Sequence, residues 1–369
     1  MRILIFILTF ISCLPAQHPG DKIVKKGVEA FYNYDYKNSV KILTQARRDF
    51  PRNPVVHLTW AAARWRKNEA YLTQSEIYEN FNQDLDSVIS VYNDLLIEKP
   101  EDPEYLLYLG ATTGLKARIL LGQKEWFSTL MAAYQGFRLI QQAFELDPSL
   151  KDAYLPIGIM EYYSGLSNFM VKFAAEIFGL HPSREIGIRK MEIAARESEW
   201  AWSEAESILS FIYLWADIDL ERGLAVSSDL AEQYPRNYDF QIHYAESLLQ
   251  NGQLKPAYKK LKELNERLPE LTEQQQRWYT SYLNYEWGHY FFLTGELDRA
   301  QNYLKLCIEN YNAELDAILA FAWLRSGMIY DLKGQREEAI KAYKNCIELD
   351  NFSKAIQLAE TYLEQPYNG

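Results

Sequence analysis

The chain has 369 residues, of which 48% are hydrophobic and 14% aromatic, and its formal net charge is -11. This hydrophobic content excludes a disordered chain, and the length exceeds that of one ordinary compact core. The negative charge, together with the absence of a concentrated basic face, excludes nucleic acid as a partner. Two or three globular domains, or one extended repeat array, remain as candidate architectures.

The first sixteen residues have the pattern of a secretory signal peptide. Arg2 supplies a positive charge, an apolar run follows, and the segment ends on Pro15 and Ala16. The pattern predicts cleavage after Ala16 and a periplasmic or secreted protein. Two alternatives stay open: lipidation of Cys13, with outer-membrane association, and an uncleaved apolar anchor. No later apolar run approaches membrane-spanning length, so no stable membrane span is expected in the mature chain.

The next segment predicts a first pair of helices over residues 20–53. Gly27 is followed twelve residues later by Ser39, and then by apolar residues three and four apart. This spacing is typical of two short helices that pack closely around a turn. Three tyrosines crowd that turn, namely Tyr32, Tyr34 and Tyr36. The following pairs contain extra residues near 67–82 and 116–127, which lengthen the helices or add loops.

A further insertion at 163–182 separates the helices of the fourth pair. Phe169, Phe173 and Ile177 share one helical stripe there, and the helix either docks a partner or is buried inside the array. An Arg-Glu-x-Gly segment ending at Gly187 follows the insertion. On this basis, residues 158–194 resemble a segment of repeat proteins related to a fungal family of mitochondrial outer-membrane and inclusion-body-clearance function.

The most regular part of the chain is 238–352, where three similar units follow one another. In the last unit Trp323, Gly327 and Tyr330 share one helical face, and Gly334 separates them from Ala339 and Tyr343 on a second helix. This pattern resembles the tetratricopeptide repeat, a helix-turn-helix unit of 34 residues. The resemblance implies an all-α, right-handed α-solenoid over 17–366 with about eight helix pairs, ended by a capping helix at 353–364.

Two cysteines of the mature chain occupy equivalent places in consecutive repeats. Cys307 comes seven residues after Ala300, and Cys346 seven residues after Ala339. Equivalent positions on stacked helices lie about 10 Å apart, which is beyond the reach of a disulfide. We therefore expect both cysteines to be small buried apolar residues.

The sequence contains no motif that predicts catalysis. It lacks a nucleophile elbow, a phosphate-binding loop and a dinucleotide fingerprint. The five histidines lie far apart, and none has a second histidine or a cysteine three or four residues away. We therefore predict no enzyme activity, no catalytic residue, no metal site and no cofactor.

The remaining candidate site is the concave face of the array. In tetratricopeptide arrays the first helix of each pair lines this face, which implies a partner-binding groove. The alternative is that neighbouring turns or the cap helix cover these residues. The resemblance assigns the following residues to the groove: Tyr282, Tyr285, His289, Phe292, Phe321, Leu324, Met328 and Asp331.

These observations predict a scaffold or adaptor that binds a protein or peptide partner in the bacterial cell envelope. The alternative function is a small-molecule or solute-carrier component, with a pocket closed by the 163–182 insertion. A third class is a helical accessory of an envelope enzyme on a separate chain. An open concave face would favour the adaptor, and a closed groove would favour the carrier.

Overall fold

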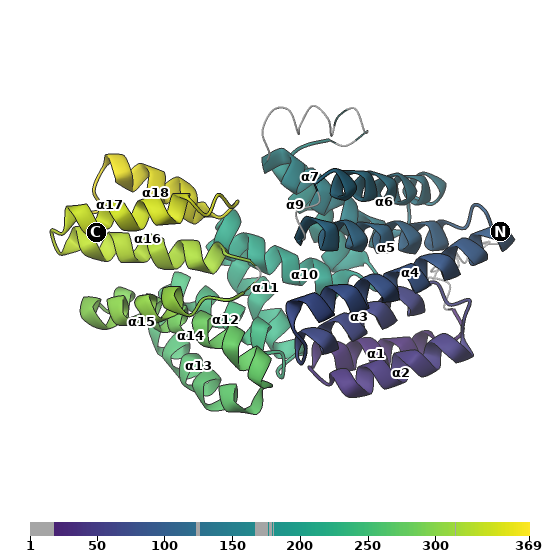
Figure 1. Ribbon diagram of the computed structural model, residues 1–369, viewed down its shortest axis with the longest axis horizontal. Coiled ribbons are helices and arrows are strands. Elements are labelled where there is room, and N and C mark those ends of the chain that lie inside the picture. Colours follow the sequence, from purple (N-terminus) through teal and green to yellow (C-terminus); the bar gives the residue numbers. More distant parts are fainter. Residues whose placement is uncertain (1–17, 123–125, 167–175, 177–178, 180, 314) are drawn as a thin grey trace, which may run out of the picture.

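The structure is a computed structural model that describes residues 18–369 except 123–125, 167–175, 177–178, 180 and 314 (Figure 1). The predicted signal peptide, with Cys13, and most of the 163–182 insertion lie outside the described residues. The regular elements within the described ranges are all helical. The predicted fold class, an all-α solenoid of helix pairs with a C-terminal cap, is therefore confirmed.

Seventeen α-helices are described, and none of them is both long enough and apolar enough to cross a membrane. Their bounds are α1 (Asp21–Tyr32), α2 (Tyr36–Asp49), α3 (Val56–Glu69), α4 (Gln74–Glu98), α5 (Pro103–Gly122), α6 (Trp126–Leu146), α7 (Tyr154–Leu166), α9 (Arg184–Glu197), α10 (Trp202–Phe211), α11 (Leu220–Gln233), α12 (Tyr238–Gln250), α13 (Leu254–Arg267), α14 (Glu273–Leu293), α15 (Leu297–Glu309), α16 (Ala317–Leu332), α17 (Arg336–Ile347) and α18 (Lys354–Glu364).

The helices pack in sequence order, as in a solenoid. Each described helix from α9 onward contacts the next along the chain, and α1 to α6 do the same. The first helices of successive pairs also touch, as α12 does with α14 and α14 with α16. The last helix, α18, packs across both α16 and α17, which covers the end of the array. The core is therefore continuous from pair to pair, with no separate globular centre.

Small residues allow the two helices of a pair to approach closely. A side chain on Gly327 would overlap the ring of Tyr343, and one on Gly187 would overlap the backbone of Gly158 and Tyr162 in α7. These glycines therefore mark the points in the sequence where the two helices of a pair cross most closely. Cys307 and Cys346 are both fully buried, as predicted.

Two helices begin with side-chain caps. Thr272 and Gln275 form a reciprocal capping box that begins α14. Thr73 and Glu76 form another at the start of α4. In the 67–82 region the extra residues lengthen α4, which has 25 residues, and the extra residues near 116–127 lengthen α5 and α6.

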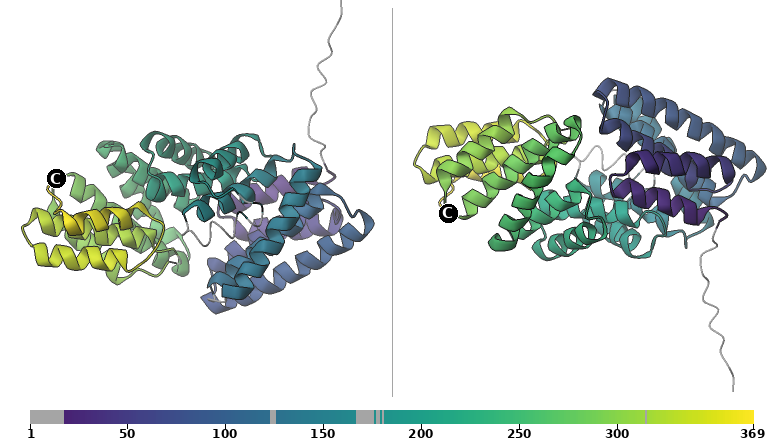
Figure 2. Two further views of the ribbon diagram at one scale, coloured as in Figure 1. Left: turned by 90° about the horizontal axis from the view of Figure 1, so that it is seen from above. Right: turned by 90° about the horizontal axis from the view of Figure 1, so that it is seen from below.

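The array curves so strongly that its first pair returns to the middle of the chain (Figure 2). Tyr32 packs in one buried cluster with Leu230, Tyr234 and Phe240. The Asn237 side-chain amide donates to the backbone carbonyl of Tyr32 over 2.9 Å. We call the contacts of residues 25–36 and Ala70 with α10, α12 and α14 the closure interface. It narrows the groove into a cavity that remains partly open.

Candidate functional site

The strongest candidate site is a cavity of about 800 Å³ at the centre of this closed turn, which we call the central cavity. Its wall comes from α1 to α5, α7, α10, α12, α14, α16 and the segment before α16. Twelve of its 28 lining residues are aromatic. Such a volume lies within the range of about 300–1,000 Å³ that is typical of ligand pockets.

One wall of the central cavity is the turn between α1 and α2. The hydroxyl oxygens of Tyr34 and Tyr279 lie 2.6 Å apart, and the Tyr34 hydroxyl also accepts from the backbone N–H of Asp239 over 3.3 Å. The Tyr34 ring centroid lies 5.2 Å from that of Tyr36, and Tyr279 meets Tyr282 edge to face at 6.1 Å. This wall therefore joins the first pair to the sixth and seventh.

The charged groups of the cavity gather near the same wall. Arg66 pairs with Glu69 over 2.9 Å, and 45% of the Arg66 side chain is accessible. Glu69 and Glu204 raise the pKa of Arg66 by their negative charge, so Arg66 stays a cation. Glu204 accepts a hydrogen bond from the Tyr32 hydroxyl at 3.2 Å. The carboxylates of Glu69 and Glu204 therefore act on one guanidinium, and the cavity is lined by a third carboxylate, that of Asp239.

Asp239 has the least compensated charge of these groups. Its side chain is 36% accessible, and the His243 Nε2 atom lies 3.8 Å from its carboxylate. Burial lowers the pKa of His243, so this imidazole is neutral at pH 7 and offers little compensation. Burial and the charge of Asp239 both raise the pKa of Tyr34 above its usual value. The negative charge of Asp239 therefore acts on the part of the cavity wall that contains Tyr34.

A second polar element lies in the interior beside the cavity. We call Glu246, Tyr285, Glu286, His289 and Arg325 the buried ionic cluster. His289 Nδ1 lies 2.7 Å from Glu246, and the Arg325 guanidinium lies 3.7 Å from the same carboxylate. The Tyr285 hydroxyl donates to Glu246 over 3.2 Å and accepts from Arg325 over 3.3 Å. The cluster thereby links α12, α14 and α16.

Its protonation states follow from burial and charge. Burial alone would raise the pKa of Glu246, but His289 and Arg325 together lower that pKa to about 2. Burial and the negative Glu246 raise the pKa of Glu286, which therefore stays protonated at pH 7. Burial and Arg325 lower the pKa of His289. The ionised pair is then Glu246 with Arg325, and the cluster is electrically balanced.

The cluster contains atoms that are also metal ligands in other proteins. Glu246, Glu286 and His289 each offer one such atom, and these atoms lie within 4.8 Å of one another. However, the Arg325 guanidinium lies 3.2 Å from His289 Nδ1 and already balances Glu246. A divalent ion there would meet a fixed positive charge in a dry interior. The geometry fits a structural ion pair better than a metal centre.

The residues predicted for the groove divide into three groups. Tyr282 lines the central cavity. Tyr285 and His289 belong instead to the buried ionic cluster and are almost completely buried. Phe292 is half-buried, with its ring 6.3 Å from that of Tyr367, and Asp331 accepts hydrogen bonds from Arg336 and Tyr343.

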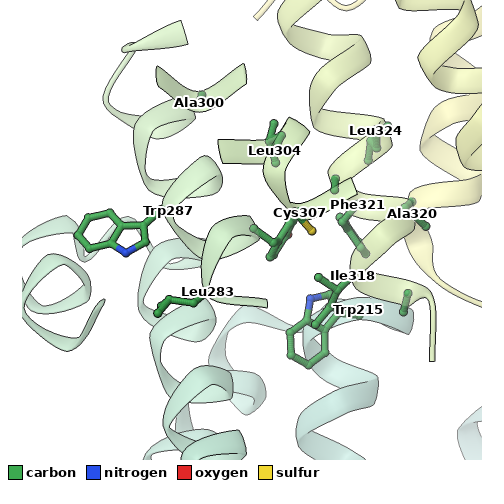
Figure 3. Packing of buried hydrophobic residues seen from close by; sticks show 14 of the residues in the cluster. Trp215, Leu283, Trp287, Ala300, Leu304, Cys307, Ile318, Ala320, Phe321 and Leu324 are labelled. Carbon is green, nitrogen blue, oxygen red and sulfur yellow. The ribbon is translucent and has the colours of Figure 1, made fainter. Parts of the chain in front are cut away.

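The remaining predicted groove residues lie in the hydrophobic core. Phe321, Leu324 and Met328 are each at most 8% accessible, and Phe321 and Leu324 pack beside Leu304 and Cys307 of α15 (Figure 3). Their assignment to an open groove is therefore wrong for this conformation. The physical reason is the tight curvature, which packs the first helices of neighbouring pairs against each other.

Sequence reasoning missed several residues that the structure places on the cavity wall. Asp239 and Trp278 had no distinguishing pattern. Trp215 lies on η2, a π-helical turn over Ile212–Ala216, and such turns occur often at functional sites. The sequence does distinguish Tyr34, because it stands at a turn position that glycine occupies in the regular repeats. Those glycines are Gly252, Gly295 and Gly334.

Comparison with known proteins agrees with this architecture. Residues 322–353, which cover most of α16 and all of α17, match the family model described as tetratricopeptide repeat. The match covers one helix-turn-helix unit of the chain. No curated protein matches the sequence.

The solved structures that resemble this chain are distant from it in sequence. A human IFIT1 dimer with PPP-AAAA is 10% identical, with a TM-score of 0.43 and coverage of 94% of this chain and 83% of that chain. NprR in complex with its cognate peptide NprX is 12% identical, with a TM-score of 0.42 and coverage of 94% and 82%. A tetratricopeptide repeat protein from Parabacteroides merdae is 12% identical, with a TM-score of 0.32 and coverage of 87% and 98%.

Proposed function

We propose that this protein is a non-catalytic scaffold or adaptor that binds a peptide segment of a partner protein in the central cavity. The observation that carries the proposal is the aromatic wall of a cavity of about 800 Å³. Aromatic side chains supply large contact area at a low cost in conformational entropy. A cavity of this size admits a few residues of an extended segment and excludes a folded domain.

The cavity wall also offers polar contacts that a peptide backbone would use. The indole N–H of Trp215 has no hydrogen-bond partner among the described residues, although Trp215 is fully buried and lines the cavity. Buried donors are normally paired, so an acceptor from an occupant would complete this site. Peptide carbonyls are acceptors of the required kind. Among the solved structures with this type of fold, the NprR complex contains a cognate peptide.

The setting that we propose is the bacterial cell envelope, in the periplasm or outside the cell. The proposal rests on the signal-peptide pattern of residues 1–16, which also leaves lipidation at Cys13 as a variant of it. An exported adaptor would have its partner in the same compartment. Fractionation of cells that produce the full-length chain tests this point, and recovery of the uncleaved chain in the cytoplasm would contradict it.

The narrowed cavity also supports the second candidate, a small-molecule or solute-carrier component. The closure interface surrounds the space on the side of α1 and α2, and Tyr163 at the start of the predicted insertion lines it. A partly enclosed cavity suits a small ligand as well as a peptide segment. Mass spectrometry of the native protein, purified and then denatured, would detect a bound small molecule and would favour this alternative.

A peptide library tests the main proposal directly. Random twelve-residue peptides displayed on phage would be selected on the wild-type protein and on Ser207→Trp, which fills the cavity from α10. Ser228→Trp is the matched control, because Ser228 is also half-buried but lies on α11 outside the cavity.

The expected result is a set of related peptides enriched on wild type and on Ser228→Trp but lost on Ser207→Trp. Circular dichroism would verify that both variants keep their helical content. Equal enrichment on all three proteins, or none on wild type, would overturn the assignment of peptide binding to the central cavity.

A further inference from the structure

The turn at Tyr34 breaks a rule that the regular repeats obey. In each regular repeat the turn between the two helices contains a glycine with a positive φ angle. The values are 67° at Gly252, 78° at Gly295 and 69° at Gly334. Tyr34 has a φ of 63° at the same position and makes the same pattern of backbone hydrogen bonds. A bulky residue in this left-handed conformation costs about 1–2 kcal/mol relative to glycine. Local backbone preference therefore does not explain the tyrosine.

The side chain of Tyr34 does explain it. Its hydroxyl is paired with Tyr279 and with the backbone of Asp239, and its ring lies beside Tyr36. All four residues line the central cavity. A glycine at this position would leave a gap in the wall. Residues that break a local rule often occupy functional sites, so the exception directs attention to this part of the cavity.

The negative charge of this part of the cavity favours a positively charged group of a ligand. The Asp239 carboxylate is partly accessible and lies beside a neutral imidazole. Glu69 and Glu204 are close by, and Arg66, paired with Glu69, is the cation that faces them. With Arg118 included, three carboxylates and two guanidiniums line the whole cavity, so its formal charge is negative. The chain as a whole carries -11, which also attracts a basic partner.

We propose that Tyr34, Tyr36, Tyr279, Tyr282 and Asp239 form a subsite for a cationic side chain, lysine or arginine, of the bound peptide. Aromatic faces attract a cation, and a carboxylate at their edge adds an ion pair. An acidic side chain would instead meet three carboxylates with one guanidinium near them. This inference rests on the proposed peptide-binding function, because it names which peptides the cavity takes.

The same peptide selection tests it with a different readout. Sequencing of the peptides enriched on wild type is expected to show lysine and arginine at least threefold above the starting library. Asp239→Asn is expected to abolish this preference. Glu221→Gln is the matched control, because Glu221 is also in the first turn of its helix, α11, but lies outside the cavity.

A double-mutant cycle then locates the contact. One enriched peptide would be synthesised with its lysine and with norleucine, and each would be titrated by fluorescence anisotropy. We expect norleucine to weaken binding to wild type about tenfold, and to have little effect on Asp239→Asn.

Each outcome separates this inference from the function on which it rests. Cavity-dependent peptides without a basic preference, or an equal effect of norleucine on both proteins, would overturn the cationic subsite and leave peptide binding intact. Enrichment of acidic peptides would show that Arg66 and Arg118 determine the choice. Absence of cavity-dependent enrichment would overturn both.

Discussion

The hydroxyl oxygens of Tyr34 and Tyr279 lie 2.6 Å apart although 245 residues separate the two in the sequence. One tyrosine belongs to the turn of the first helix pair and the other to α14 of the seventh. Their contact closes the curved array on itself. The central cavity therefore depends on the pairing of Tyr34 with Tyr279. Without this closure the same residues would line an open groove.

Loss of the Tyr34 hydroxyl should loosen this closure. Tyr34→Phe removes the contacts with Tyr279 and with the Asp239 N–H but keeps the ring and the backbone strain. We expect a loss of about 1–2 kcal/mol in the free energy of unfolding. Faster hydrogen exchange should appear at both α1 and α14 in mass spectrometry. Protection that stays at the wild-type level in both helices would contradict the role of this contact.

Two glycines give a matched pair for the close helix contacts. A side chain at Gly187 would overlap the backbone of Gly158 and Tyr162, whereas a side chain at Gly114 would have no neighbour within 4 Å. Gly187→Ala is expected to destabilise the protein by about 1–3 kcal/mol. Gly114→Ala is expected to stabilise it by up to about 1 kcal/mol, because it reduces the entropy of the unfolded chain. Urea denaturation measures both, and the same sign for the two variants would refute this account.

The pH dependence of stability should contain a contribution from Glu206. Burial and the nearby Asp229 raise the pKa of this side chain from 4.5 to about 7. Between these values the folded state holds a proton that the unfolded state releases, so stability falls as the pH rises from 4.5 through 7. Glu206→Gln should remove this loss.

We expect Glu206→Gln to be about 1–2 kcal/mol more stable than wild type at pH 8, with solvent screening taken into account, and similar to it at pH 4. Thermal unfolding at the two pH values is the measurement. A variant that is equally stable at pH 8 would show that Glu206 ionises freely in the folded protein.

The two acids of the buried ionic cluster should respond very differently to the same change. Glu246→Gln leaves the Arg325 charge without its partner in the interior, which should cost about 3–5 kcal/mol. Glu286→Gln replaces a protonated acid with an uncharged amide of similar shape, so the change should stay below about 1 kcal/mol at pH 7. Denaturant titrations compare them. A larger loss from Glu286→Gln would mean that Glu286 is the ionised member.

Much of the fold could be predicted because its signals are local. The spacing of Gly327 and Tyr343 reports the crossing of two helices that are adjacent in the chain. The capping pair Thr272 and Gln275 likewise marks the start of α14 within four residues. Each repeat carries this information in its own sequence, so the solenoid of helix pairs follows from it.

The site could be predicted only in part, because it depends on the curvature of the whole array. The sequence places Tyr282 and Tyr285 on one helix, but it does not show that one faces the cavity and the other is covered by its neighbours. The return of Tyr34 to α14 is a contact over 245 residues, which no local pattern specifies. The one local indication of this part of the cavity wall is Tyr34, which occupies a turn position that is glycine in the regular repeats.

The central claim, peptide binding inside the closed turn, is tested most directly by site-specific photocrosslinking. A benzophenone amino acid would replace Tyr282 in the cavity wall or Tyr258, which is 43% accessible on α13 and does not line the cavity. A peptide enriched in the library selection would be added to each protein and irradiated. We predict a covalent product at position 282 and none at 258. A product at 258 alone, or equal yields at both positions, would contradict the account.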